Sequence, residues 1–190
     1  DRDIDPWNLY YLSLSKNTEA GSLTGRVNQA QRFGETGYQG EINFYPSVGE
    51  GKYFYLNVGY SNSGIFPRWR TGAEYFQSLP ASTEISLGFR LLQFSGEPVK
   101  IFTGSISKYW GSYLFTLRPY YVPDSSGDSL SGALTARYYL NDEEYLSLTA
   151  GSGIASTTDV NLQFFEQHSQ KIGIDGNFRI SNSAFVSPGY

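Results

Sequence analysis

Hydrophobic and polar residues alternate along most of this chain. In residues 129–140, Leu130 and Leu134 fall on one side of an extended chain, whereas Thr135 and Arg137 fall on the other. Because successive side chains of a β-strand point to opposite faces, this pattern predicts a strand with one apolar and one polar face. The segment is about 10 residues long, which is the length that a tilted strand needs to cross a bilayer.

The same pattern recurs in eleven clear segments and one partial segment. We expect strands at residues 7–15, 22–33, 38–45, 52–61, 70–79, 83–94, 99–108, 112–122, 129–140, 145–151 and 168–180, with a twelfth beginning in 183–190. Bacterial single-chain barrels have even strand numbers, so we expect twelve, or ten if segment 70–79 or 99–108 is miscounted. A soluble sandwich would show the same period. Nearly every segment shows it here, with tyrosine at the ends and arginine or glutamate on the polar side. This favours an all-β, transmembrane, antiparallel up-and-down β-barrel with short loops.

A few positions disturb the alternation. The pattern blurs at residues 29–31, where a β-bulge would shift its phase. Pro119 cannot donate to a strand ladder, so we expect a gap or a bulge there. The phase of residues 99–108 is ambiguous, and residues 152–167 form the longest irregular stretch.

The chain fits one domain of 190 residues. We divide it into a polar lead-in at residues 1–6 and a barrel domain at residues 7–190. Ser187 to Tyr190 interrupt the last segment, so we expect the C-terminal strand to be truncated. The sequence lacks a run of about 18 apolar residues, so we expect neither a transmembrane helix nor a remaining signal peptide. The mean hydropathy of -0.36 does not exclude a barrel, because half of each strand would face a polar interior.

Composition narrows the possible chemistry. The chain has 16 tyrosines, 13 phenylalanines and 3 tryptophans, enough for aromatic girdles at two membrane interfaces, although a large soluble sheet would use them as well. It lacks cysteine, and its 14 lysines and arginines are scattered. We therefore expect no cysteine metal site, no cofactor and no nucleic-acid partner.

The polar faces collect charged and hydrogen-bonding side chains that we assign to the lumen of the barrel. They are Arg26, Glu41, Asn43, Tyr53, Tyr55, Asn57, Glu74, Glu84, Arg90, Arg118, Tyr120 and Arg137. One interpretation is packing, because a small barrel interior is filled by side chains and its charges must pair. The other is a selective conduit, in which the arginines bind anionic groups and Tyr53, Tyr55 and Tyr120 stack on sugar rings. The mixed signs argue against a strong ion selector.

Catalytic and metal-binding patterns are weak. His168 is the only histidine, and Ser169 lies next to it. Because neighbours on a strand point to opposite faces, His168 cannot activate Ser169. The turn acids Asp124, Asp128 and 142–144 do not fit a calcium-loop spacing. We therefore expect neither an enzyme nor a metal site.

The most distinctive loop consists of Ile65, Phe66, Pro67, Arg68 and Trp69. Its apolar residues could enter the membrane interface, where tryptophan and arginine are common. The loop could instead fold over the mouth of the barrel, or bind a partner.

An ordered set of short segments resembles the YaiO-type outer-membrane β-barrel family. The segments are residues 53–61 (YFYLNVGYS), 65–67 (IFP), 72–75 (GAEY), 86–94 (SLGFRLLQF), 108–113 (KYWGSY) and 136–139 (ARYY). The resemblance extends over most of residues 7–180. It implies a barrel in the outer membrane of a Gram-negative envelope, and it supplies no catalytic motif. Members of the family often carry periplasmic tetratricopeptide repeats ahead of the barrel or are encoded near sugar-polymer genes.

Three functions follow as expectations. The first is a structural or assembly subunit, or a membrane anchor, of an envelope complex. The second is a channel or export component for a sugar polymer or another small polar solute. The third, kept for completeness, is an outer-membrane hydrolase. The expected partners are outer-membrane lipids, other envelope proteins, and an oligosaccharide or polysaccharide.

Overall fold

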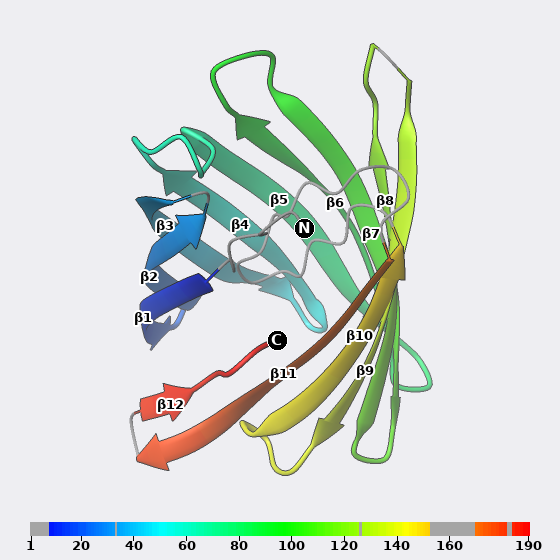
Figure 1. The fold of residues 1–190 in the computed structure, drawn as a ribbon. Coiled ribbons are helices and arrows are strands. Elements are labelled where there is room, and N and C mark those ends of the chain that lie inside the picture. The colour runs from blue at the N-terminus through cyan, green and yellow to red at the C-terminus, as the bar shows by residue number, and fades with distance from the viewer. Residues whose placement is uncertain (1–7, 33, 126, 153–169, 182–183) are drawn as a thin grey trace. The chain divides into compact units, whose positions relative to one another are not determined.

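Twelve antiparallel strands form one sheet in the computed structural model, which describes residues 8–32, 34–125, 127–152, 170–181 and 184–190. Each strand pairs with its neighbours in the sequence, in the order β1 to β12. The strands are β1 (Asn8–Thr18), β2 (Gly21–Arg32), β3 (Glu35–Gly49), β4 (Lys52–Tyr60), β5 (Trp69–Leu79), β6 (Thr83–Gln93), β7 (Val99–Trp110), β8 (Tyr113–Val122), β9 (Ser129–Tyr139), β10 (Tyr145–Ser152), β11 (Gln170–Ser181) and β12 (Ala184–Val186) (Figure 1). The predicted all-β, up-and-down topology and the count of twelve are confirmed.

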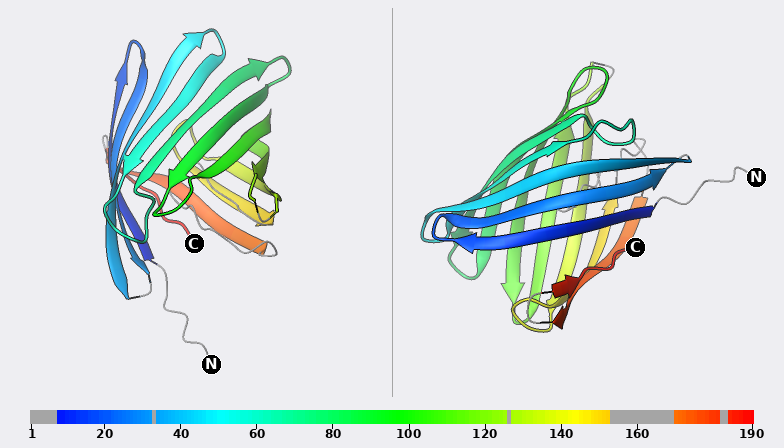
Figure 2. Two further views of the ribbon diagram at one scale, coloured as in Figure 1. Left: turned by 90° about the horizontal axis from the view of Figure 1, so that it is seen from above. Right: turned by 90° about the vertical axis from the view of Figure 1, so that its left-hand side faces the viewer.

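Two compact units divide this sheet. Unit 1 comprises residues 1–76 and 88–102, and unit 2 comprises residues 77–87 and 103–190. In unit 1, β1, β2 and β3 lie side by side (Figure 2). In unit 2, β9 pairs with both β8 and β10, and β10 pairs with β11. Within the described ranges, no helix is long and apolar enough to cross a membrane.

Burial along the strands is the reverse of that in a soluble sheet. On β3, Glu41 and Asn43 are each 5% exposed, whereas Tyr38 is 56% and Ile42 is 53% exposed. The alternation that predicted the strands therefore places polar side chains on the buried face and apolar side chains on the exposed face. We call these the polar face and the apolar face.

The phase of β7, ambiguous from the sequence, is settled by burial. Ile101, Thr103 and Ser105 are buried on the polar face, whereas Phe102 and Ile106 are 48% and 52% exposed. The sequence was ambiguous because both faces carry residues that favour β-structure.

The predicted bulge at residues 29–31 is wrong. The pairing of β2 with β1 and with β3 runs through Gln29 and Gln31 without a break. These two glutamines continue the exposed face near the end of the strand, so their polarity marks the strand end and not a change of phase. The bulge of this region lies on β3 instead, between Ser47 and Gly49.

Pro119 does not disturb the pairing of β8 with β9. The register is continuous from Tyr113, opposite Tyr138, to Val122, opposite Ser129. Pro119 lies opposite Gly132, which has no side chain to collide with the pyrrolidine ring. The predicted bulge is therefore wrong on this side of the strand. The irregular stretch predicted at 152–167 lies, apart from Ser152, outside the described residues.

Candidate functional site on the polar face

A buried carboxylate organises the polar face of unit 1. Glu41 Oε1 accepts hydrogen bonds from Arg70 Nη1 and from Asn28 Nδ2, each at 3.1 Å. The Arg70 and Glu41 side chains are only 3% and 2% exposed. Gly59 lies opposite Glu41 on β4, and a Cβ there would lie 3.1 Å from Glu41 Cγ. The glycine thus leaves room for the ion pair, whose charges are buried but compensated.

A second buried pair lies on β5 and β6 in the same unit. Arg90 Nη2 and Glu74 Oε2 are 3.8 Å apart, and the two side chains are 3% and 2% exposed. At this distance the contact is electrostatic and not a hydrogen bond. Gly88 lies beside it, where a Cβ would be 2.6 Å from Glu74 Cβ.

Two of the tyrosines predicted to stack on sugars are used for packing in unit 1. The Tyr55 hydroxyl donates to Asn43 Oδ1 at 3.0 Å, and Asn57 Nδ2 donates to the same oxygen at 2.7 Å. Tyr55 is 2% exposed, so its ring is closed to a ligand. Tyr53 stacks on Phe76 with ring centroids 4.7 Å apart.

Hydroxyl groups line the polar face of unit 2. Side-chain hydrogen bonds join Ser86 to Ser105 at 2.6 Å, Ser107 to Thr116 at 2.9 Å, and Thr135 to Thr149 at 2.9 Å. Arg118 Nη1 lies 3.4 Å from Thr103 Oγ1, which itself donates to the Pro119 carbonyl at 3.0 Å. These small side chains pair across neighbouring strands and fill this face with short polar contacts.

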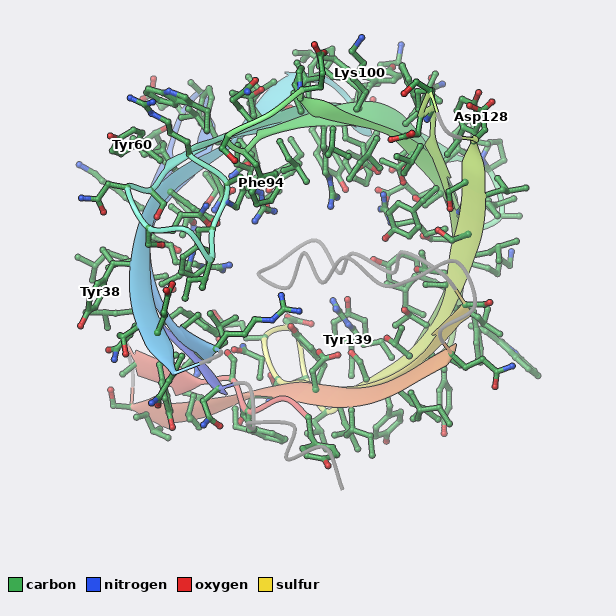
Figure 3. The ribbon with its side chains drawn as sticks, turned by 45° about the horizontal axis from the view of Figure 1, so that its top comes forward. Tyr38, Tyr60, Phe94, Lys100, Asp128 and Tyr139 are labelled. Atoms are coloured by element: carbon green, nitrogen blue, oxygen red, sulfur yellow. The ribbon has the colours of Figure 1, made fainter. Side chains whose placement is uncertain are left out.

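Arg137 is surrounded by tyrosines at one end of unit 2. Its guanidinium lies 3.9 Å from the ring centroid of Tyr145 and 5.9 Å from that of Tyr139, and its Nε donates to Ser147 Oγ at 3.0 Å. Tyr139 lies on the polar face of β9 (Figure 3), and its ring centroid is 6.4 Å from that of Tyr109. We call Tyr109, Arg137, Tyr139 and Tyr145 the tyrosine–arginine cluster. Among the described residues, no carboxylate forms an ion pair with Arg137.

The other predicted lumen residues also lie on the polar face. Arg26 lies opposite Glu41 in the pairing of β2 with β3, with its guanidinium 4.8 Å from the ring centroid of Tyr11. Tyr120 is 1% exposed, so it cannot stack on a ligand. Glu84 interacts electrostatically with Tyr109.

The loop before β5 divides its residues between the interior and the surface. Phe66 is 8% exposed, and Ile65 packs where a Cβ on Gly37 would collide with it. Trp69, in contrast, is 49% exposed on the apolar face, with its ring centroid 4.8 Å from that of Tyr60. Phe66 therefore packs within unit 1, whereas Arg68 and Trp69 are exposed. The interfacial, mouth-covering and partner-binding placements stay predictions.

Several residues of these networks were missed by the sequence analysis. Asn28 and Arg70 were not among the candidates, although each shares its strand parity with one, Asn28 with Arg26 and Arg70 with Glu74. Tyr139 and Tyr145 were also missed, because a tyrosine at a strand end is equally typical of an aromatic girdle. In the part of the chain that the structure describes, no group of three or more histidines or acids could hold a metal ion. His168 and Ser169 lie outside the described residues.

Apolar side chains cover the opposite face in a band with aromatic ends. In unit 2, Leu117 lies opposite Leu134, and both are more than half exposed. Nearer the strand ends, Tyr113 lies opposite Tyr138 with ring centroids 5.0 Å apart. In unit 1, Tyr38 and Tyr60 project from the exposed side of β3 and β4 (Figure 3).

An antiparallel sheet that exposes a leucine-rich band with aromatic ends and buries its charges is typical of a membrane-spanning β-barrel. This defines the class of the protein. The comparison with family models identifies the family: residues 1–157 match the YaiO membrane beta barrel domain, and the chain belongs to this family. The predicted family is therefore confirmed. Searches among curated proteins and among solved structures found no match.

Proposed function

We propose that this protein is an outer-membrane β-barrel with a filled interior, acting as a structural subunit or membrane anchor of an envelope complex and not as an enzyme. The family supports a membrane β-barrel. The class supports the outer membrane as the location, because bacterial barrels with aromatic girdles and alternating strands are typical of that membrane.

The observation that carries this proposal is the pairing of charges on the polar face of unit 1. Arg70 is hydrogen-bonded to Glu41, and Arg90 lies beside Glu74, with every one of these side chains at most 3% exposed. An open conduit would keep such groups hydrated and accessible. Buried and compensated charges instead favour an interior in which side chains pack against each other.

Single-channel recording in a planar bilayer tests the filled interior. The wild-type protein should show no steady open conductance. The double variant Glu41→Ala/Arg70→Ala removes the buried pair without leaving a lone charge, and it should produce conductance events if side chains block the path. A steady open conductance of the wild-type protein would contradict the proposal.

The subunit role needs a separate measurement. The tagged protein should copurify with a stoichiometric partner from native membranes after mild crosslinking. Membranes separated by density should show it with the outer-membrane fraction. Recovery of the chain alone after crosslinking would argue against a role in a complex, and recovery in the inner-membrane fraction would contradict the location.

A second candidate, passage or export of a sugar polymer or another polar solute, is favoured by one observation. The tyrosine–arginine cluster of unit 2 places ring faces and a guanidinium on the polar face, near the ends of β7 and β9. Rings with hydroxyl groups combine apolar faces with hydrogen-bonding capacity, which suits a polar solute that moves past them. The bilayer recording separates this candidate from the first.

A further inference from the structure

We infer that the tyrosine–arginine cluster of unit 2 is a binding site for an uncharged saccharide. This goes beyond the proposed structural role and does not require that the barrel conduct anything. The site needs only a sugar ring that reaches the end of the polar face.

The first observation is the exposure of an aromatic ring on the polar face. Tyr109 is 44% exposed, whereas Tyr120 on the same face of the neighbouring strand is 1% exposed. The Tyr109 and Tyr139 rings are nearly parallel, with an interplanar angle of 25° and centroids 6.4 Å apart. The cluster therefore offers an accessible aromatic ring that packs beside a second ring. The C–H groups of a pyranose can pack against such an apolar face.

The second observation is the mixture of donors and acceptors around these rings. Arg137 is held by its ring contact with Tyr145 and by the hydrogen bond from its Nε to Ser147. Its guanidinium carries further N–H donors and has no ion-pair partner among the described residues. Glu84 adds a carboxylate that interacts electrostatically with Tyr109. Sugar hydroxyl groups both donate and accept, so they can hydrogen-bond to a guanidinium and to a carboxylate.

The third observation is the balance of charge, which selects an uncharged ligand. A cation would be repelled by Arg137. An anion would meet Glu84 and also Asp175, which interacts electrostatically with Arg137. A neutral saccharide is repelled by neither charge, because each charged group can hydrogen-bond to one of its hydroxyl groups.

The position of the cluster makes it accessible from the end of the sheet. Tyr109 is the penultimate residue of β7, Tyr139 is the last residue of β9, and Tyr145 is the first of β10. These three positions adjoin the turns 111–112 and 140–144, at the same edge of an antiparallel meander. A chain of sugars can approach this edge without entering the buried part of the polar face.

Saturation-transfer NMR on the full chain in lipid nanodiscs tests the inference. The probes are cellohexaose and maltohexaose as neutral oligosaccharides, hexagalacturonate as an acidic one and chitosan hexamer as a cationic one. We expect transfer from the protein to the ring protons of at least one neutral hexamer. Tyr109→Leu should weaken its binding roughly tenfold, since the contact with an aromatic face is lost, whereas Tyr109→Phe should retain most of it.

Tyr113→Leu is the matched control. Tyr113 flanks the same turn as Tyr109 and has a similar exposure, 47%, but it lies on the apolar face. This variant should bind like the wild-type protein, and it reports any general effect of losing a tyrosine at this edge. Equal weakening by both leucine variants, binding confined to the acidic or the cationic hexamer, or no transfer to any neutral hexamer would each overturn the inference.

Discussion

The buried ion pair of unit 1 allows a quantitative prediction about how the polar face is stabilised. In Glu41→Gln, the new amide oxygen can still accept hydrogen bonds from Asn28 and Arg70, but the negative charge is lost. The Arg70 side chain is 3% exposed, so its charge has almost no access to water. Breaking a buried pair on one side costs about 3–5 kcal/mol. Because glutamine keeps an acceptor, we expect a loss of about 2–4 kcal/mol of unfolding free energy.

The double-mutant cycle separates the pair from its surroundings. Arg70→Met should cost about 3–5 kcal/mol, because it leaves the Glu41 carboxylate buried with Asn28 as its one hydrogen-bond donor among the described residues. Glu41→Gln/Arg70→Met removes both charges and should cost less than the sum of the single variants by at least about 2 kcal/mol. The cycle therefore measures the coupling and not the loss of one side chain.

The assay is denaturant unfolding of the protein in lipid vesicles, followed by tryptophan fluorescence. Glu143→Gln provides the control, because Glu143 forms its ion pair with Arg179 at the surface, where the side chains are 51% and 42% exposed. It should change the unfolding free energy by at most about 0.5 kcal/mol. The reasoning would be refuted if the losses of the two single variants summed to the loss of the double variant within about 0.5 kcal/mol, since residues this close in a buried network should couple.

Three further predictions concern the faces, the packing and a turn. Leu134 is 54% exposed on the apolar face, so Leu134→Arg should lower the unfolding free energy in a bilayer by about 2–4 kcal/mol. Thr135→Arg should lower it less, because this variant loses only one hydroxyl hydrogen bond on the polar face. Equal losses for the two variants in vesicle unfolding would contradict the face assignment. Gly88→Ala should cost about 1–3 kcal/mol more than Gly40→Ala in the same assay, since the new Cβ would lie 2.6 Å from a neighbouring backbone oxygen at Gly88 but meets nothing within 4 Å at Gly40. A hydrogen bond from a backbone N–H of β11 lowers the pKa of Glu144, and one from an asparagine amide of its own turn lowers it further. The contribution of Glu144 to stability is therefore present above its ordinary pKa of about 4.3 and is lost as the pH falls through the lower pKa of the folded state. An NMR titration should show this acid-induced loosening of the turn in the wild-type protein and not in Glu144→Gln.

The period of two was sufficient to predict which face each side chain occupies. Glu41, Glu74 and Arg90 were assigned to one face from their parity alone, and the structure places all three on the buried polar face. This works because a strand has only two faces, so a single residue of known orientation fixes its neighbours. The number of strands could be predicted from the same alternation.

Parity does not reveal which residues meet. Arg70 reaches Glu41 across 29 positions of sequence, and this contact depends on the register of the strands. The register is set by turn geometry and by bulges. The bulge between Ser47 and Gly49 follows Pro46, in residues that lie between the predicted strands 38–45 and 52–61. If this bulge is not foreseen, the predicted register is wrong for every contact between β3 and β4, although the faces of the other strands are still predicted correctly.

The sequence also did not predict how deeply each residue of a strand is buried. Tyr55, Tyr120 and Tyr109 all have the parity of the polar face, but they are 2%, 1% and 44% exposed. Tyr109 lies at the end of β7, next to a two-residue turn, whereas the other two are surrounded by neighbouring strands. The sequence pattern contains the period but not the vertical offset between strands. The sequence analysis selected two buried tyrosines, Tyr55 and Tyr120, as sugar-stacking candidates. It missed Tyr109, because the predicted segment 99–108 ended one residue before it and had an ambiguous phase.

Small residues beside the buried charges explain how so much polar bulk fits on one face of unit 1. Gly59 leaves space for Glu41, and Gly88 leaves space for Glu74, in each case on the strand that faces the acid. Long charged side chains and glycines thus complement each other as large and small apolar residues do in a soluble core. Because this complementarity needs a defined neighbour at each position, the polar face of unit 1 resembles a packed interior more than a hydrated wall. The same criterion distinguishes the tyrosine–arginine cluster, where Tyr109 remains 44% exposed at the end of its strand.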